Sequence, residues 1–133
     1  MRLVVNTGVF SAALSRRTRH LFEAQVASLR GNQIFLAAAT VAELRYGAMV
    51  AEWGAPRRQR VEQAIAATTV VPVSDGLLTT MAELRAACRR AGHPLADRIH
   101  GNDLWIAASA IHIDAPVVTA DTVFIGAPGL RLA

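Results

Sequence analysis

Residues 2–10 read RLVVNTGVF, a short apolar run that ends in two polar residues and a glycine. Segment 3–5 is apolar at every position, which is typical of a strand buried on both faces of a parallel sheet. Asn6 follows this strand directly, and Thr7 and Gly8 then lead into a predicted helix. Functional side chains of such sheets gather beyond the carboxyl ends of the strands, so Asn6 stands where a site is expected.

The same alternation of apolar runs and helical patterns continues along the chain. Further strands are predicted at 34–36, 70–73 and 117–118, with a last edge strand at 130–132. Helices are predicted at 20–30, 40–52, 57–67, 75–90 and 103–113, the last two capped by Ser74 or Asp75 and by Asn102. This order indicates an α/β sandwich around a mainly parallel sheet, in a single domain that spans residues 1–133.

Composition narrows the class of protein further. No apolar run approaches the ~20 residues that cross a membrane, and the first residues do not read as a signal peptide. The single Cys88 excludes an intrachain disulfide framework and a Cys-rich zinc site, and it fits a reducing cytoplasm. The four histidines lack metal-ligand spacing. We therefore expect a cytoplasmic protein that does not enter a membrane.

The net charge is +4, and every basic residue is an arginine. The absence of lysine excludes a P-loop and Schiff-base chemistry. Arginine suits bidentate contacts with phosphate, and a basic excess favours polyanionic partners. Ordinary solvated helix faces explain any one cluster equally well. The clusters are Arg16, Arg17 and Arg19, then Arg57, Arg58 and Arg60, then Arg89 and Arg90.

Three carboxylates join Asn6 at the predicted rim of the sheet. Asp121 follows the 117–118 strand, Glu43 is expected in the first turn of the helix after the second strand, and Asp103 opens its helix. Carboxylate oxygens so arranged suit Mg²⁺ or Mn²⁺, which activate water and neutralise charge on a reacting phosphate. Structural alternatives remain open. Glu43 could complete a capping box with Thr40, Asp103 could complement the helix dipole, and Asp121 could cap a turn.

Four segments together resemble one known family: LVVNTGVF (3–10), TVAELRYGA (40–48), LRAACRRAGHPLADRIHGNDLWIAASAI (84–111) and VVTADTVF (117–124). They are similar to PIN-domain ribonucleases, specifically the VapC-type toxins of type II toxin–antitoxin pairs. The family normally has Asp where Asn6 stands, and its other acidic metal-binding and catalytic positions fall on Glu43, Asp103 and Asp121. Thr7 and Thr119 match its polar companions near the metal, and Ser109 matches a small hydroxyl position.

The resemblance implies a PIN-like α/β/α fold and an endoribonuclease that uses Mg²⁺ or Mn²⁺ to cut structured RNA such as tRNA or rRNA. It also implies a homodimer that a cognate VapB-like antitoxin silences in a hetero-oligomer. Two departures stand out: the family often has an Asp at the position of Val123, and Asn6 lacks a charge. Losing a ligand charge weakens metal binding and catalysis, so we expect an attenuated or inactive form, whether natural or engineered.

The main candidates for contacts with RNA phosphates are Arg16, Arg17 and Arg19, and Arg45 and Arg85 are weaker candidates. The alternative function is a catalytically inactive PIN-fold interaction module that binds an antitoxin or RNA. A phosphatase or DNA nuclease with a similar acidic rim is a further alternative. Core packing, rather than stacking on bases, is expected of the aromatic residues Tyr46, Trp53, Trp105 and Phe124.

Overall fold

The computed structural model describes residues Met1–Ala133 and contains one four-stranded parallel sheet. The spatial order is β3-β2-β1-β4, which places β1 between β2 and β4. In this register Val4 lies opposite Phe35 on one side and Val117 on the other. The predicted α/β fold with a parallel sheet is confirmed. The strands are β1 (Arg2–Val5), β2 (Gln33–Leu36), β3 (Thr69–Val70) and β4 (Val117–Val118).

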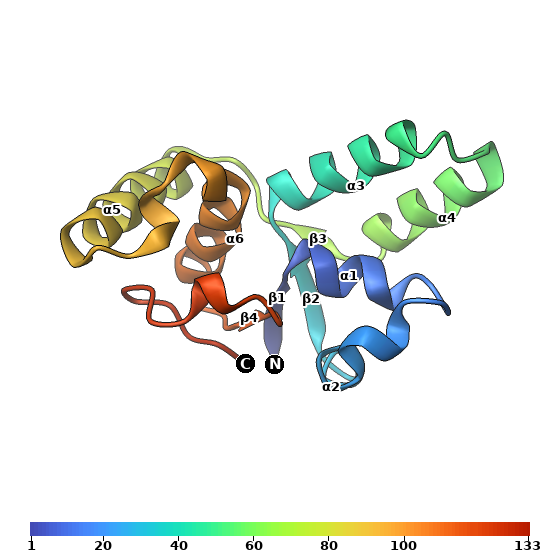
Figure 1. Ribbon diagram of the computed structural model, residues 1–133, viewed down its shortest axis with the longest axis horizontal. Helices are drawn as coiled ribbons and strands as arrows, with labels where there is room; N and C mark the ends of the chain where they lie inside the picture. Colours follow the sequence, from blue (N-terminus) through green and yellow to red (C-terminus); the bar gives the residue numbers. More distant parts are fainter.

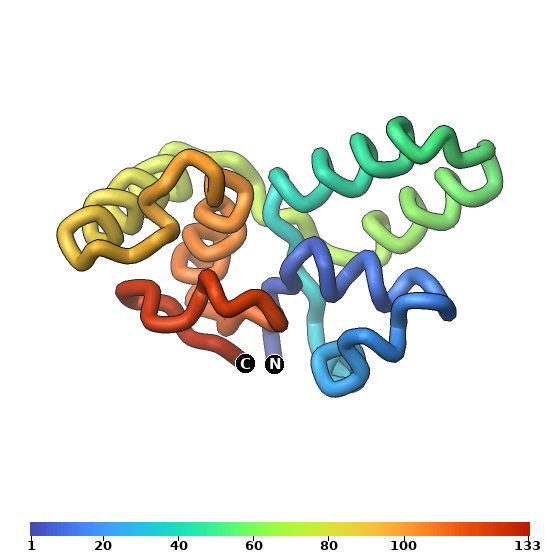
Figure 2. Tube along the Cα trace, in the orientation of Figure 1, coloured from blue at the N-terminus to red at the C-terminus, as the bar shows by residue number.

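Six α-helices flank the sheet, with α5 and α6 on one side and α1 to α4 on the other (Figure 1). The two ends of the chain lie close together at one edge of the molecule (Figure 2). The helices are α1 (Thr7–Ala13), α2 (Glu23–Ala27), α3 (Ala38–Val50), α4 (Ala55–Ala66), α5 (Asp75–Ala91) and α6 (Gly101–His112). Four 3-10 turns connect them: η1 (Arg19–Phe22), η2 (Pro94–Ala96), η3 (Arg98–His100) and η4 (Thr122–Phe124).

Both faces of the sheet are covered by apolar side chains. Val4 packs into a core with α5 and α6, whereas Leu3 and Val5 pack into a second core with α1, α3 and α4. Successive side chains of a strand point to opposite faces, so each residue of segment 3–5 enters one of the two cores. This explains why the segment is apolar at every position. Strand β1 ends at Val5, and Asn6 is the first residue after it.

The predicted caps of α5 and α6 have different outcomes. Ser74 caps α5, because its hydroxyl oxygen accepts a hydrogen bond from the Leu77 amide at 3.1 Å. Asn102 does not cap α6, so that prediction is wrong. The 3-10 turn η3 runs directly into α6, Gly101 is already in the helical region, and Asn102 lies inside the helix.

Three other predicted elements are shorter than expected. The 20–30 helix is divided into η1 and α2 and ends before Gly31, whose φ of 75° is left-handed. The 70–73 strand is reduced to Thr69–Val70, since Pro72 has no amide hydrogen to continue the ladder. The 130–132 strand is reduced to one parallel bridge between Val117 and Leu132. None of the helices combines the length and apolar composition that crossing a bilayer requires.

Candidate active site

The end of β1 is joined to the segment after β4 by the side chain of Asn6. The Asn6 Oδ1 atom accepts a hydrogen bond from the Gly8 amide at 2.8 Å and so caps α1. The Asn6 Nδ2 atom donates to Thr119 Oγ1 at 2.9 Å. Thr119 Oγ1 also accepts from the Asp121 amide at 3.0 Å. Thr119 therefore links position 6 to the turn that carries Asp121.

These partners determine which way the Asn6 amide points. A backbone N–H can only donate, so the oxygen of Asn6 must face Gly8 and its NH₂ group must face Thr119. An aspartate here would place a second oxygen where the NH₂ group lies, and the Thr119 hydroxyl would donate to it. In this chain the atom on the Thr119 side is a donor, which cannot serve as a metal ligand.

Asp121 begins the 3-10 turn η4. Its Oδ1 atom accepts from the Val123 amide at 3.0 Å, so the structure contains the turn cap that was an alternative for this residue. Asp121 is exposed rather than buried, and its second carboxylate oxygen has no hydrogen-bond partner in the protein. One oxygen is therefore structural while the other remains available to a ligand.

Asp103 lies in the first turn of α6 and is half-buried. Burial raises the pKa of Asp103, and the negative charge of Asp121 raises that pKa further. His100 acts in the opposite direction and lowers the Asp103 pKa, with its Nδ1 atom 3.4 Å from Asp103 Oδ2. Because the charge of Asp121 acts on the pKa of Asp103, the two carboxylates lie within electrostatic range of each other, although 18 residues separate them in the sequence. Sequence reasoning missed His100; its spacing of three residues from Asp103 at a helix start was the available signal.

Glu43 is connected to the same rim through Thr7, the residue after Asn6. The Thr7 hydroxyl lies 3.0 Å from Glu43 Oε1 and 3.0 Å from the hydroxyl of the fully buried Thr40. A hydroxyl carries one proton and a carboxylate can only accept, so Thr7 donates to Glu43 and accepts from Thr40. The capping-box alternative is wrong, because α3 has Ala37 at its N-cap and begins at Ala38. Glu43 consequently lies in the second turn, not the first.

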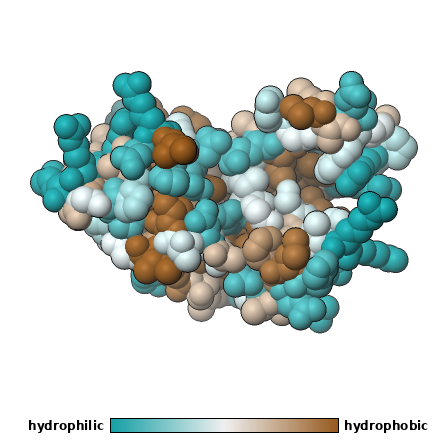
Figure 3. All heavy atoms as spheres, in the orientation of Figure 1, coloured by the Kyte–Doolittle hydropathy of each residue, from teal (hydrophilic) through white to brown (hydrophobic).

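The starts of α3 and α6 face a hollow in the molecular surface. Helices α3 and α6 pack against each other, and Figure 3 shows the surface hollowed between the α5–α6 part and the α3–α4 part. No three His, Cys, Asp or Glu side chains form a cluster that could hold a metal ion. Asp103 and Asp121 nevertheless fit a hard divalent cation, because they are oxygen donors close enough for their charges to interact and the only side chain paired with Asp103 is the His100 imidazole. Asn6 does not fit as an anionic ligand.

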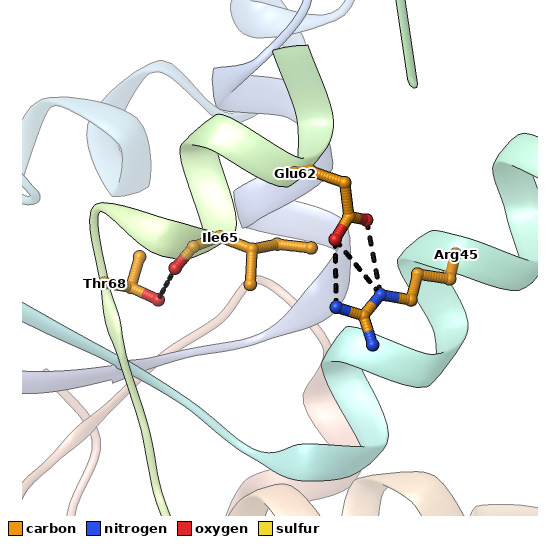
Figure 4. A network of polar contacts seen from close by, with 4 residues as sticks. All are labelled: Arg45, Glu62, Ile65 and Thr68. Atoms are coloured by element: carbon orange, nitrogen blue, oxygen red, sulfur yellow. Dashed lines mark hydrogen bonds and ion pairs between the residues drawn. The ribbon is translucent and has the colours of Figure 1, made fainter. Parts of the chain in front are cut away.

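Two predicted site residues have other partners. The Ser109 hydroxyl is buried and donates to the Trp105 carbonyl of its own helix at 2.7 Å, so no hydrogen bond joins it to the carboxylates. Arg45 forms a bidentate contact with Glu62 that joins α3 to α4, while Thr68 closes the end of α4 on Ile65 (Figure 4). The pairing with Glu62 makes Arg45 a poor phosphate ligand.

The first arginine cluster lies away from the acidic rim: Arg16 and Arg17 are in the segment between α1 and η1, and Arg19 is the first residue of η1. Arg16 and Arg17 are exposed and form no ion pair, whereas Arg19 donates to the Ala13 carbonyl at 2.9 Å. The side chains of Arg16 and Arg17 are therefore free to contact a polyanion. No hydrogen bond or ion pair connects them to the carboxylates.

The aromatic residues divide between core and surface. Phe124 is 1% exposed and Trp105 is half-buried against the same core, as predicted. Trp53 packs against the other core, the one shared with α1, α3 and α4, and the guanidinium carbon of Arg57 lies 3.6 Å from the centre of its ring. The prediction for Tyr46 is wrong: it is 69% exposed, because it lies on the outer face of α3.

Tyr46 belongs to an exposed apolar stripe that also contains Met49 and Val50. These residues are three and four positions apart, so they share one face of α3. The sequence contained this signal, since the core-facing residues Leu44 and Ala48 occupy a different face of the same helix. The stripe is a surface without a partner in this chain.

His93 holds the segment after Asp121 against the turn after α5. Its Nδ1 atom accepts from the Leu95 amide at 3.2 Å, and its Nε2 atom lies 2.8 Å from the Ile125 carbonyl. A carbonyl only accepts, so Nε2 carries the proton and donates to Ile125. The connection joins η2, which leads toward Asp103, to η4, which Asp121 caps.

Comparison with known proteins identifies the family. The model of the PIN domain family matches residues 3–130, and the chain therefore belongs to the PIN domain family. Within that family its relatives are VapC proteins. Ribonuclease VapC5 from Mycobacterium tuberculosis is 34% identical over 128 residues, which cover 95% of this chain and 87% of VapC5. The resemblance to VapC-type PIN-domain proteins expected from the sequence is thus confirmed.

Solved structures show the same fold. The toxin–antitoxin structure VapBC-5 from Mycobacterium tuberculosis matches with a TM-score of 0.67 and 28% identity, over 98% of this chain and 96% of that one. VapBC2 from Rickettsia felis, solved bound to a promoter DNA fragment, matches with a TM-score of 0.80 and 22% identity, over 100% and 98%. The second likeness shows the fold alone.

Proposed function

We propose that residues 1–133 form one PIN domain with the scaffold of a metal-dependent endoribonuclease toxin, and that Asn6 weakens its activity. The single observation that carries this proposal is the chain of contacts Asn6–Thr119–Asp121, with Asp103 beside it. The chain brings position 6 to the acidic rim, where the family has a carboxylate, and presents an NH₂ group there. The relationship to Ribonuclease VapC5 supports RNA as the substrate.

Asp103 and Asp121 are the residues that would hold Mg²⁺ or Mn²⁺. Such an ion, when bound, would stabilise the charge that develops on a phosphodiester and would lower the pKa of a bound water. Glu43 has one oxygen held by Thr7 and the other free, so it is placed to accept a proton from an attacking water. Thr119 orients both Asn6 and the Asp121 turn. We assign the attenuation of the chain to Asn6, which contributes no negative charge.

Structured RNA such as tRNA or rRNA is the proposed substrate class. The exposed arginines Arg16 and Arg17 supply two phosphate-binding groups in the segment after α1, and neither is engaged in an ion pair. Contacts of this kind position an RNA without reading its bases. The choice of target would then depend on the shape of the surface around the carboxylates.

A VapB-like antitoxin and a second copy of the chain are the proposed partners. The solved relatives are VapBC complexes, which supports an antitoxin partner. A cavity of about 290 Å³ lies between α3 and α4, beside Met49, and the exposed stripe of Tyr46, Met49 and Val50 adjoins it. An exposed apolar surface of this kind is typical of a protein–protein interface. We place the antitoxin at this α3–α4 surface.

The test is an Asn6→Asp variant assayed on purified total bacterial RNA with Mg²⁺ or Mn²⁺, followed by sequencing of the new RNA ends. Restoring one charged group at such a site changes rates by about 10²–10³-fold, so cleavage should increase by that order. Asn6→Ala is the matched control and should stay inactive, as should Asn6→Asp in EDTA. Absence of metal-dependent cleavage by Asn6→Asp would leave the inactive interaction module as the better account.

A further inference from the structure

A second basic surface lies on exposed residues of α5, beside the turn η2. The hollow there has a volume of about 400 Å³ and is bounded by helix α5 and the turn η2. Five residues line it: Ala82, Arg85, Ala86, Arg89 and Ala96. We call it the α5 groove. In Figure 3 hydrophilic side chains cover this end of the molecule.

The groove has a floor of small side chains and two guanidinium groups at its edge. Arg85 and Arg89 are four residues apart on one helix face, so their β-carbons are about 5–6 Å apart. The Nε atom of Arg85 contacts the Ala96 carbonyl at 3.4 Å. This contact holds the stem of Arg85 and leaves both terminal nitrogens free. The alanines leave room for a ligand to approach the guanidinium groups closely.

The two arginines have no anionic partner in the protein. The ion pairs of the structure are Arg45–Glu62, His100–Asp103 and Arg131–Asp114. No acidic residue lines the groove. Like charges one helical turn apart destabilise a helix, and an anion bound between them would relieve this repulsion.

Helix electrostatics explain only part of the arrangement. The last turn of α5 contains Arg89 and Arg90, where positive charge complements the helix dipole. Arg85 lies six residues before the end of the helix, outside that turn. Its place beside Arg89, over a floor of alanines, is therefore not accounted for by the dipole and suits a ligand with adjacent anionic groups.

The groove also lies along the chain path that leads to the acidic rim. Ala96 and Asp103 are seven residues apart, and even a fully extended segment of that length spans only about 25 Å. The intervening residues form η3, which shortens the path. An RNA cleaved at Asp103 and Asp121 could therefore reach the groove with a neighbouring stretch of its backbone.

We propose that Arg85 and Arg89 bind backbone phosphates of RNA that flank the phosphodiester at the acidic rim. The proposal rests on the proposed ribonuclease function. Each guanidinium can form two parallel hydrogen bonds with one phosphate, which matches the free terminal nitrogens. The contact would hold RNA independently of the metal and would carry no base specificity.

The test uses fluorescence anisotropy to measure the binding of a fluorescein-labelled RNA stem-loop to the full chain in EDTA. Binding is measured over a range of salt concentrations from about 50 to about 300 mM. The chain as it stands, with Asn6, serves as the reference because it leaves the RNA uncut in EDTA. The test variant is Arg85→Gln/Arg89→Gln. The matched control, Arg30→Gln/Arg90→Gln, removes the same charge from exposed arginines that do not line the groove. Thermal melting of both variants verifies the fold.

Loss of two phosphate contacts should lower the slope of log K against log salt by about 1.4–1.8 and weaken binding about 25- to 60-fold at 0.1 M salt. The control should lose less than a third of that slope. The proposal that the α5 groove binds RNA would be overturned if the two double variants lost equal amounts of RNA affinity, or if the unaltered chain did not bind RNA. Failure of the proposed ribonuclease function is seen separately, as absence of cleavage by the Asn6→Asp variant.

Discussion

Asn6→Asp should make the stability of this fold depend on divalent cations. The substitution keeps the size of the side chain and its cap on the Gly8 amide. It replaces the NH₂ group by a charged oxygen, and the Thr119 hydroxyl can turn to donate to that oxygen while still accepting from the Asp121 amide. No hydrogen bond is lost, so the effect on stability is mainly the added charge.

The size of the effect follows from the contacts around Thr119. Bonds of 2.9 and 3.0 Å join Asn6 to Thr119 and Thr119 to the Asp121 amide. These bonds end at the Asp121 amide and not at its carboxylate, so the energy is taken for an illustrative separation: like charges about 6–8 Å apart repel by about 0.5–0.7 kcal/mol in bulk water and about 2–3 kcal/mol at an effective dielectric constant of 20. Because Asp121 is exposed, we expect a loss of about 1–2 kcal/mol without metal. For a domain of this size that lowers Tm by about 3–10 °C.

Differential scanning calorimetry in EDTA and in saturating Mn²⁺ measures both parts of the prediction. A cation at 100 times its Kd stabilises the folded state by about 2.7 kcal/mol, enough to reverse the loss. The unaltered chain should gain much less from Mn²⁺. Gln63→Glu on exposed α4 adds the same charge away from the site and should change Tm little under either condition. If Asn6→Asp and the unaltered chain melt alike with and without Mn²⁺, position 6 is not part of a metal site.

Three further predictions concern neighbouring contacts. The His93→Asn variant keeps a group that can accept from the Leu95 amide but loses the bond to the Ile125 carbonyl, so amide hydrogen exchange in η4 should become faster. The His93→Gln variant should preserve the protection, because the glutamine NH₂ group extends as far as the histidine Nε2 atom does. Thr7→Val leaves the buried Thr40 hydroxyl without its partner and should cost about 1–3 kcal/mol in urea unfolding, whereas Thr7→Ser should recover most of it. The raised pKa of Asp103 means that the folded state binds this proton more tightly than the unfolded state. In EDTA, the stabilising effect of this proton should therefore grow as pH falls from the raised pKa of Asp103 toward 3.8, the ordinary value for an aspartate. The Asp103→Asn variant should be more stable than the unaltered chain at pH 7 and should not show this gain at lower pH. Measuring Tm against pH for both proteins checks the prediction.

The fold could be predicted from local patterns because both cores draw on the same short strand. Leu3 and Val5 enter one core and Val4 the other, so the run 3–5 indicates a doubly covered parallel strand before any contact is known. Helix starts were less predictable. Asn102 is a good capping residue, yet α6 begins at Gly101 because η3 already delivers the chain in a helical conformation.

The arrangement of the candidate site depends on contacts that sequence spacing cannot give. Thr119 is 113 residues from Asn6, and Thr7 is 36 residues from Glu43. Spacing predicted the rim at which these residues meet, but not that Glu43 is held by Thr7 instead of capping α3. It also could not show that the Asn6 amide is oriented by the Gly8 amide. Such orientations are set by donors and acceptors that become neighbours only when the sheet forms.

Asn6 is compatible with the fold, which confines its consequence to chemistry. Every buried side-chain nitrogen and oxygen has a hydrogen-bond partner, and both ends of the Asn6 amide are engaged. A neutral donor at this position also avoids adding a third charge beside Asp103 and Asp121; burial first, and the charge of Asp121 second, already raise the pKa of Asp103. The chain with Asn6 should therefore be the more stable form without metal and the less active form with it. On the proposed function, stability and activity at position 6 would be opposed, because the charge that would bind the cation would repel its neighbours when no cation is bound.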